Sequence, residues 1–147
     1  MTSCRSALPL AMLWLTLSCS NDGSDALGPD ELSFTAEEHL RTTEDHLGAA
    51  AASSVVGIGV SGTVLGSLCT HLVVPIGRVS GSSVSLTVEL RPRTTDPVCP
   101  PAEFVIHYTA FFDELTVGGT YSVRVVHVRQ PGNEVTAPFE GPITVGG

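Results

Sequence analysis

Histidines are the residues of this sequence whose spacing could most directly support chemistry. His39 and His46 are seven residues apart in "TAEEHLRTTEDHL", which would place both imidazoles on one face of a helix but too far apart to bind one metal ion directly. His107 and His127 lie in two expected strands, and imidazoles paired across neighbouring strands can bind a metal or respond to pH. For both pairs we expect solvated or hydrogen-bonded side chains. We therefore predict no metal site and no cofactor.

The motifs that could support catalysis are incomplete. Ser61 in "GVSGT" lacks the second flanking glycine and the following helix of a nucleophile elbow. Asp113 and Glu114 are adjacent, so on a strand they would point to opposite faces instead of sharing a cleft, as glycoside hydrolysis requires. The stretch "GIGVSG", residues 57–62, matches the dinucleotide-binding spacing, but a β-branched, Gly-interrupted segment follows it in place of a helix. We expect a protein that is not an enzyme, with a small hydrolase as the alternative.

The charge distribution argues against one class of partner. The chain has 147 residues and a net charge of −8, and its seven cationic side chains are all arginine. Because nucleic-acid binding requires a basic face, we expect no nucleic-acid partner. Most of the acidic excess lies in residues 20–47, and residues 20–33 are also rich in Gly, Pro and Ser. This composition is typical of a flexible linker.

The first twenty residues have the three parts of an export signal. A cation precedes an apolar run, small residues follow it, and the run is about half of the roughly 20 residues that cross a bilayer. Cys19 closes the run, and the stretch resembles a bacterial lipoprotein signal, although Thr16 stands where such signals prefer Leu. The resemblance implies a signal peptide over residues 1–18 and a lipid on Cys19, anchoring the chain at the outer membrane or cell surface. Cleavage near Ser18 or Ser20, which gives a soluble secreted protein, is the alternative.

Two further cysteines, Cys69 and Cys99, lie beyond the signal. Two thiols in an oxidising compartment predict one disulfide. The bridge would close a loop of about 30 residues and stabilise the fold by about 3–4 kcal/mol. His71 lies close to Cys69 and is compatible with a metal pair instead, but no C-x-x-C or H-x-x-x-H spacing accompanies it.

From Val55 onward the sequence alternates as β-strands do. In "SVSLTVEL", Val and Leu alternate with Ser, Thr and Glu, and "EFVIHYTAFF" and "TYSVRVVHV" show similar patterns. The doubled valine in the last segment favours a bulge or a strand buried on both sides. With turn-rich separators and no amphipathic helix, the pattern predicts an all-β, antiparallel sandwich or barrel of six or seven strands over residues 55–147.

Residues 19–54 would then form a lipid-anchored acidic linker that precedes the sandwich. Inside it, Thr35 and Glu38 have the spacing of a capping box, which favours a short helix. The apolar stripe around them is thin, because only Leu40 and Leu47 repeat at a helical interval. An unstructured chain is the alternative.

The stretch "LTVGGTYSVRV" is similar to the corner of immunoglobulin-like and fibronectin-type sandwiches. In those folds a Leu, a Gly-containing bend and a Tyr lead into a central strand. The resemblance implies an immunoglobulin-like sandwich in which the Tyr121 hydroxyl bonds the backbone upstream, with Leu115, Gly118 and Gly119 completing the corner. The chain lacks the antibody Cys two residues after this Tyr, so a bridge between the two remaining cysteines would not be the usual inter-sheet disulfide.

Phe111 and Phe112 come just before this corner. Because consecutive strand residues face opposite ways, one should enter the core and the other be exposed, as a candidate partner contact. The sequence as a whole predicts a non-catalytic cell-envelope lipoprotein, a binding or structural module on a flexible tether. Its partners would be the membrane, through Cys19, and an envelope protein or glycan. A carbohydrate-binding module or a small hydrolase on the same sandwich is the alternative.

Overall fold

The computed structural model describes residues 32–67, 72–92, 103–130 and 132–146. This part of the chain holds no helix and eight strands: β1 (Leu32–Leu40), β2 (Gly48–Ser53), β3 (Ile58–Ser67), β4 (Leu72–Ser80), β5 (Ser83–Arg91), β6 (Glu103–Phe112), β7 (Thr120–Arg129) and β8 (Glu134–Thr144). Consequently it contains no helix of the length and apolarity that crossing a membrane requires. The predicted signal peptide (1–18), the predicted lipidation site Cys19 and the predicted disulfide partners Cys69 and Cys99 lie outside the described residues.

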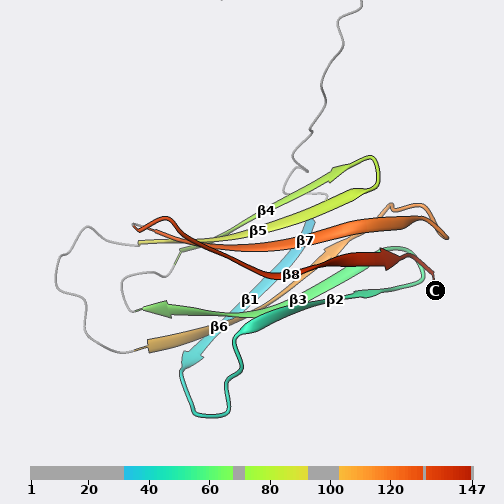
Figure 1. Cartoon of the computed structure of the whole chain (residues 1–147). Helices are drawn as coiled ribbons and strands as arrows, with labels where there is room; N and C mark the ends of the chain where they lie inside the picture. Colours follow the sequence, from blue (N-terminus) through green and yellow to red (C-terminus); the bar gives the residue numbers. More distant parts are fainter. Residues whose placement is uncertain (1–31, 68–71, 93–102, 131, 147) are drawn as a thin grey trace, which may run out of the picture.

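The eight strands form two four-stranded sheets that lie one over the other (Figure 1). One sheet has the order β1-β6-β3-β2 and is antiparallel throughout. The other has the order β4-β5-β7-β8, and within it β5 and β7 pair in parallel. The predicted all-β class is confirmed, and the arrangement is sandwich-like. The prediction of purely antiparallel pairing is wrong for β5 and β7, which are linked not by a hairpin but through β6 of the opposite sheet.

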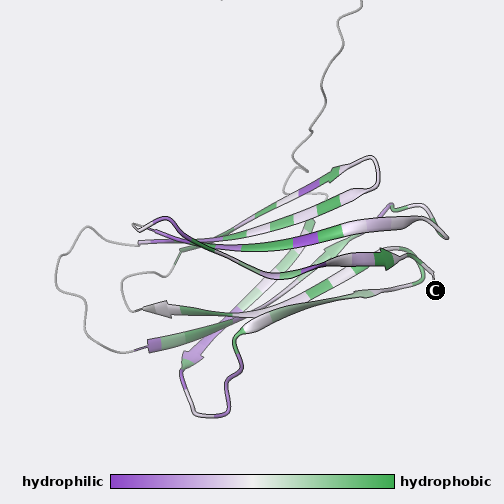
Figure 2. Cartoon of the chain, viewed as in Figure 1, coloured by the Kyte–Doolittle hydropathy of each residue, from purple (hydrophilic) through white to green (hydrophobic). Residues whose placement is uncertain are grey.

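The core lies between the two sheets, where buried side chains from both sheets meet. Figure 2 shows hydrophobic residues alternating with more polar ones along several strands. Val84, Leu86, Val88 and Leu90 of β5 are at most 1% exposed, as the alternation of "SVSLTVEL" predicts. Burial of a Val or Leu side chain contributes about 1.5–3 kcal/mol, so this strand is a main source of stability. The sheets approach closely at Gly77, because an added Cβ there would lie 3.0 Å from the side chains of Leu32 and Phe112 in the opposite sheet.

Two strands occupy the segment predicted to be an acidic linker with a short helix. β1 pairs along the whole of β6, from Leu32 opposite Phe112 to Leu40 opposite Phe104, and β2 pairs with β3. The prediction of a linker or helix is therefore wrong for Leu32–Leu40 and Gly48–Ser53. Six strands, β3 to β8, lie in the described part of residues 55–147, where six or seven were predicted, and these two earlier strands raise the total to eight. An edge strand needs few buried side chains, since β6 supplies its hydrogen bonds. Leu32 and Phe34 are enough to hold β1 against the core.

A break in register occurs opposite the doubled valine of β7. Val125 is opposite Phe139 whereas His127 is opposite Thr136, so β8 holds one residue more than β7 between these pairs. The bulge that the doubled valine favoured is present, but the extra residue belongs to β8, next to Pro138. Proline has no N–H to donate to a ladder and is typical of bulges and edge strands.

The corner before β7 is closed by its tyrosine. The backbone N–H of Thr116 donates to the Tyr121 hydroxyl at 3.0 Å, and Tyr121 and Leu115 are both buried. Gly118 has φ +79°, a conformation that favours glycine. At Gly119 an added Cβ would lie 2.9 Å from the Thr116 carbonyl oxygen and 3.0 Å from the Tyr121 ring. These four residues fix where β7 begins and are not exposed to a partner as a group.

Candidate functional site

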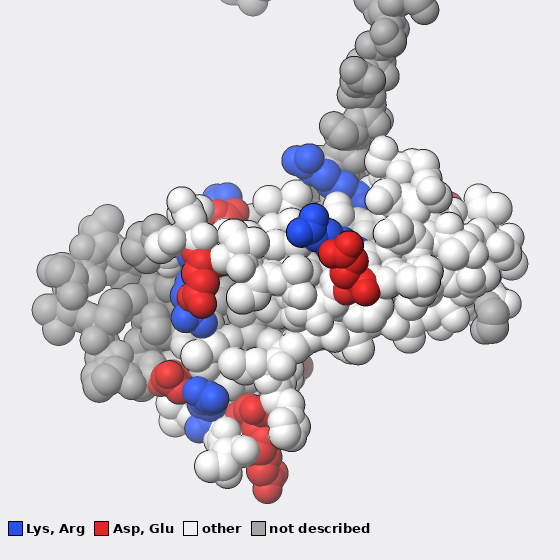
Figure 3. All heavy atoms as spheres, in the orientation of Figure 1, with Lys and Arg blue, Asp and Glu red and all other residues white. Residues whose placement is uncertain are grey.

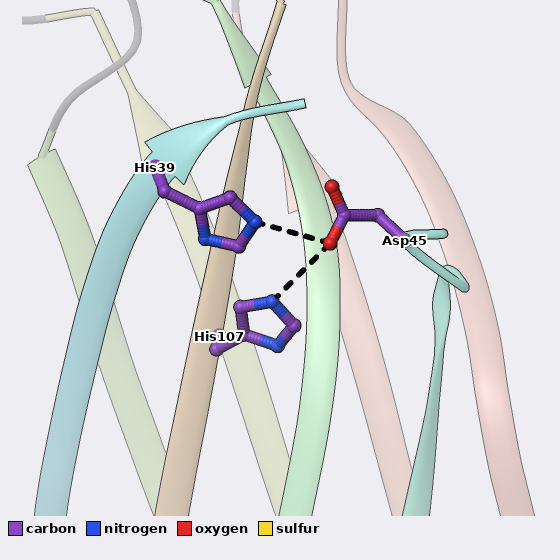
Figure 4. A group of neighbouring side chains, drawn as sticks. All are labelled: His39, Asp45 and His107. Atoms are coloured by element: carbon purple, nitrogen blue, oxygen red, sulfur yellow. Dashed lines mark hydrogen bonds and ion pairs between the residues drawn. The ribbon is translucent and has the colours of Figure 1, made fainter. Parts of the chain in front are cut away.

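Two histidines and one aspartate meet on the outer face of the β1-β6-β3-β2 sheet (Figure 4). His39 is near the end of β1, His107 is on β6, and Asp45 is in the loop between β1 and β2. Nε2 of His39 lies 3.0 Å from Oδ1 of Asp45, and Nε2 of His107 lies 3.6 Å from the same oxygen. The two rings stack, with centroids 4.9 Å apart and planes 9° apart. We call these three residues the His-Asp-His cluster.

Strand register places the two imidazoles together. His107 is opposite Glu37 on β1, and His39 is two residues further along on the same face, so the histidines are diagonal neighbours. Asp45 reaches them because its loop is folded back on itself. The Thr42 N–H and hydroxyl donate to Oδ2 of Asp45 at 2.7 and 3.1 Å, which leaves Oδ1 directed at the rings.

Hydrogen bonds set the charge and orientation of the cluster. The bond from the Thr42 backbone N–H is the main cause that lowers the pKa of Asp45 to about 2, and His39 lowers it further, so the carboxyl is ionised at neutral pH. On the other side of the cluster, the Thr63 hydroxyl lies 3.0 Å from Nδ1 of His107 and holds that ring in place. The His39 and His107 side chains are 44% and 47% exposed, so solvent can reach the ring edges.

A shallow groove runs along the same outer face from the cluster. One hollow of about 440 Å³ is floored by small residues of β2 and β3 and bounded by Phe111. A second hollow of about 360 Å³ shares Ala50, Ser61 and Thr109 with the first and extends to His107 and His46. We call the two together the outer groove. The described residues that line its larger part are all uncharged: Ser33, Ala50, Ala51, Ala52, Gly59, Val60, Ser61, Thr109, Ala110 and Phe111.

Of the two phenylalanines predicted as candidate partner contacts, Phe111 is the one on the outer face. Phe112 is fully buried in the core. The Phe111 ring lies over the glycines at the start of β3, because an added Cβ at Gly57 would be 2.9 Å from its Cζ and one at Gly59 would be 3.9 Å from its Cδ2. The glycines support one side of the ring, which is half-buried at the end of the outer groove.

His127 belongs to a different site, which lies between the sheets and is largely buried, and which we call the sealed site. A hydrogen bond of 2.7 Å joins its Nε2 to the Tyr108 hydroxyl, and the two rings meet edge to face. Burial lowers the pKa of His127 to about 4 and raises the pKa of Tyr108. Tyr108 reaches His127 across Gly62, where an added Cβ would lie 2.2 Å from the tyrosine oxygen. His107 and His127 do not pair across a sheet face, because β6 and β7 lie in different sheets; both side chains are hydrogen-bonded instead.

A third polar group closes one end of the sandwich. Glu89 is buried, and its two oxygens accept from Arg91 at 2.7 Å and from Gln130 at 2.5 Å. The hydrogen bond from Arg91 is the main cause that lowers the pKa of Glu89. Arg129 donates to the Leu65 carbonyl of the opposite sheet at 2.7 Å. These contacts connect the ends of neighbouring strands. Both oxygens of Glu89, the acid of this group, are occupied by hydrogen bonds.

Other charged side chains form pairs on the surface. Arg124 lies 3.5 Å from Glu140, and Arg129 lies 3.6 Å from Glu134. On the face of the molecule drawn in Figure 3, arginines lie beside carboxylates, with wide uncharged areas between these groups. Exposed pairs of this kind contribute at most about 1 kcal/mol each. They form no basic face among the described residues.

The remaining predicted residues are not brought into one site. Ser61 is on β3 opposite Thr109, with no imidazole as its register partner. Asp113 and Glu114 lie in the turn after β6, both exposed, and Glu114 has φ +57°. Gly57 directly precedes β3 and residues 58–62 form its first half, as expected for a Gly-rich strand and not for a phosphate-binding loop. His46 is exposed in the β1–β2 loop and lies outside the His-Asp-His cluster.

Sequence reasoning missed the His-Asp-His cluster. The alternation of β6 shows that His107 and Thr109 share a face, but the pairing of His39 with His107 depends on the register of a strand that was not expected. Asp45 carried a detectable signal, because a Thr three residues before an Asp is typical of side-chain-to-backbone turns.

The chain has no significant match to a protein-family model, to a curated protein or to a solved structure.

Proposed function

We propose that the protein is a non-catalytic binding module of the bacterial cell envelope, held there by a lipid on Cys19. The export signal over residues 1–18 and the polar, acidic stretch after Cys19 support this location. Because β1 begins at Leu32, the tether would be residues 20–31. The immunoglobulin-like family is supported by the two facing sheets and by the Tyr121 corner, whereas the parallel β5–β7 pair departs from that family's antiparallel sheets.

The observation that carries the proposal is the outer groove. Its larger hollow has a size suited to a small ligand, at about 440 Å³, and its lining is uncharged and mostly apolar. Small residues form its floor because Ala50, Gly59 and Ser61 leave the surface of the sheet low between the neighbouring strands. An uncharged hollow with one aromatic boundary fits a neutral ligand better than an ionic one.

We propose that the ligand is a neutral glycan segment. A sugar ring offers an apolar C–H face that packs on an aromatic ring, and Phe111 is placed for this contact. The hydroxyls of Ser33 and Ser61 lie in the same lining and can exchange hydrogen bonds with sugar hydroxyls. The uncharged lining also favours binding over catalysis, since no acid or base among the described residues lines the larger hollow.

Chemical-shift mapping of the full chain with neutral β-linked and α-linked oligosaccharides tests this function. We expect saturable shifts centred on β3 and β6 next to Phe111, and their loss in Ala50→Phe, which fills the hollow from an exposed position. Ser122→Phe, an exposed change on β7 of the other sheet, is the matched control and should bind as the wild type. Shifts that persist in Ala50→Phe, or an envelope protein captured in place of any glycan, would contradict a glycan groove. The mass of the same membrane-extracted protein should begin at an acylated Cys19, and an unmodified chain would contradict the anchor.

A small hydrolase is the second candidate, favoured by the position of His107 at one end of the outer groove. An imidazole there could accept a proton from water beside a bound sugar. Glycans recovered unchanged after long incubation support the binding module. Cleaved glycans, with cleavage lost in His107→Ala, would support the hydrolase.

A further inference from the structure

The donor atoms of the His-Asp-His cluster have the spacing that a small metal ion requires. A tetrahedral ion with bonds of about 2.0–2.1 Å separates its ligand atoms by about 3.3–3.4 Å. Oδ1 of Asp45 is 3.0 Å from Nε2 of His39 and 3.6 Å from Nε2 of His107, and these two distances bracket that value. All three donors lie within 4.8 Å of one another. From this geometry we propose that His39, Asp45 and His107 bind a divalent transition-metal ion.

Two of the three ligands are held in place by contacts to the side-chain atom that would not bind the ion. Thr63 bonds Nδ1 of His107, so the tautomer with a proton on Nδ1 presents a bare Nε2 to an ion. Thr42 occupies Oδ2 of Asp45, whereas Oδ1 accepts from the Nε2–H of His39 and becomes a ligand when an ion displaces that proton to solvent. Ligating histidines are generally oriented by such outer contacts on the second ring nitrogen. If these side chains had met by chance on the surface, there would be no reason for threonines to contact the non-ligating atoms, Nδ1 of His107 and Oδ2 of Asp45, and not the ligating ones.

The ligand types select the class of metal. Two imidazole nitrogens and one carboxylate oxygen suit Zn²⁺, and also Co²⁺, Ni²⁺ or Cu²⁺, whereas Ca²⁺ and Mg²⁺ prefer oxygen ligands alone. Glu37, the register partner of His107, adds a second carboxylate to the same outer face and favours a cation there. Three protein ligands leave a fourth coordination position for water or for an oxygen of a molecule bound in the outer groove.

Binding requires a change in the two rings. Their planes are 9° apart, so their nitrogen lone pairs are nearly parallel and must turn to converge on one ion. Both side chains are about half exposed and can rotate without disturbing the core, while Asp45 stays fixed by its loop. The site is therefore nearly formed before the ion arrives.

Calorimetric titration of Zn²⁺ into the full chain, purified without a histidine tag and stripped with a chelator, tests the proposal. We expect saturable binding of one ion per chain, and Co²⁺ should give the visible absorption of a tetrahedral site. His39→Ala and His107→Ala should each weaken binding at least tenfold. Thr63→Val should weaken it by about tenfold and by less than either histidine substitution, since it removes only the contact that orients His107.

His46→Ala is the matched control, because His46 is exposed in the same loop but outside the cluster. This variant should bind Zn²⁺ as the wild type does, and thermal unfolding without metal should show that each variant is folded. Absence of saturable binding overturns the proposal. So does wild-type affinity in His39→Ala or His107→Ala, or an equal loss in His46→Ala. None of these results depends on whether the groove binds a glycan.

Discussion

His107 and Tyr108 are neighbours on β6, yet they belong to two sites with opposite properties. His107 points out of the sheet and joins His39 and Asp45, where half-exposed rings surround one ionised carboxylate. Tyr108 points inward and bonds His127, where both side chains are less than 10% exposed. One residue along a strand reverses the face, and so it separates an open site from a sealed one.

The difference shows how burial decides what an imidazole can do. In the sealed pair, burial lowers the pKa of His127 to about 4, so this ring stays neutral and its Nε2 is occupied by Tyr108. In the His-Asp-His cluster, two imidazoles keep access to solvent and share an anionic neighbour. Polar side chains in the core therefore stabilise the sandwich, and those on the outer face can bind a ligand.

Substitution of two glycines of β3 should distinguish the two faces most strongly. In Gly62→Ala the new Cβ would overlap the Tyr108 ring, displace it from His127 and lower the free energy of unfolding by about 4 kcal/mol. In Gly59→Ala, on the outer face, the nearest atoms are 3.9 Å away, so the change should be within about 0.5 kcal/mol. Urea unfolding of both variants measures this, and similar losses would contradict the assigned faces.

Acid should weaken the sealed site in a defined pH window. The unfolded chain takes up a proton on His127 below its ordinary pKa of 6.5, whereas the folded chain does so only near pH 4. The free energy of unfolding should therefore fall by about 3 kcal/mol as pH decreases from 6.5 to 4. The loss of stability linked to protonation of Asp45 occurs at lower pH, between its ordinary pKa of 3.8 and its folded pKa of about 2. The first step should be absent from His127→Gln in urea titrations across pH, and an unchanged step would assign it to another group.

Removal of one hydroxyl from each site should have the smallest effect. Tyr108→Phe leaves a buried nitrogen of His127 without its partner and should lower the free energy of unfolding by about 2 kcal/mol. Thr63→Val removes the corresponding contact to His107, but water can replace it at an exposed ring, so the change should stay within about 0.5 kcal/mol. Thermal unfolding of the two variants compares them directly, and equal losses would mean that the outer cluster is structural.

The sequence predicts the fold where one face of each strand is buried. Alternation identified β5 and β6 because apolar residues occur at every second position, Val and Leu in β5 and Phe, Ile, Tyr and Ala in β6. The Leu-Gly-Tyr pattern located the corner before β7. It failed for β1 and β2, which are edge strands with acidic or alanine-rich composition and little apolar surface. Their hydrogen bonds come from β6 and β3, and a local pattern does not record pairing between distant segments.

The candidate site could not be predicted from local sequence patterns for the same reason. His39 lies on a strand that was not expected, and it meets His107 only through the register of β1 with β6. The spacing of His39 and His46 indicated a helix face, although the chain turns between them. The opposite orientation of Phe111 and Phe112 was correct, because it depends only on alternation along one strand.

Imidazole nitrogen chemical shifts, recorded while Zn²⁺ is added to the full chain, test most directly whether the open site and not the sealed one binds a metal. The Nε2 signals of His39 and His107 should move together and saturate at one ion per chain, whereas the signals of His46 and His127 should stay in place. Movement of the His127 signal, or none for His39 and His107, would contradict the division of the molecule into a binding face and a sealed core.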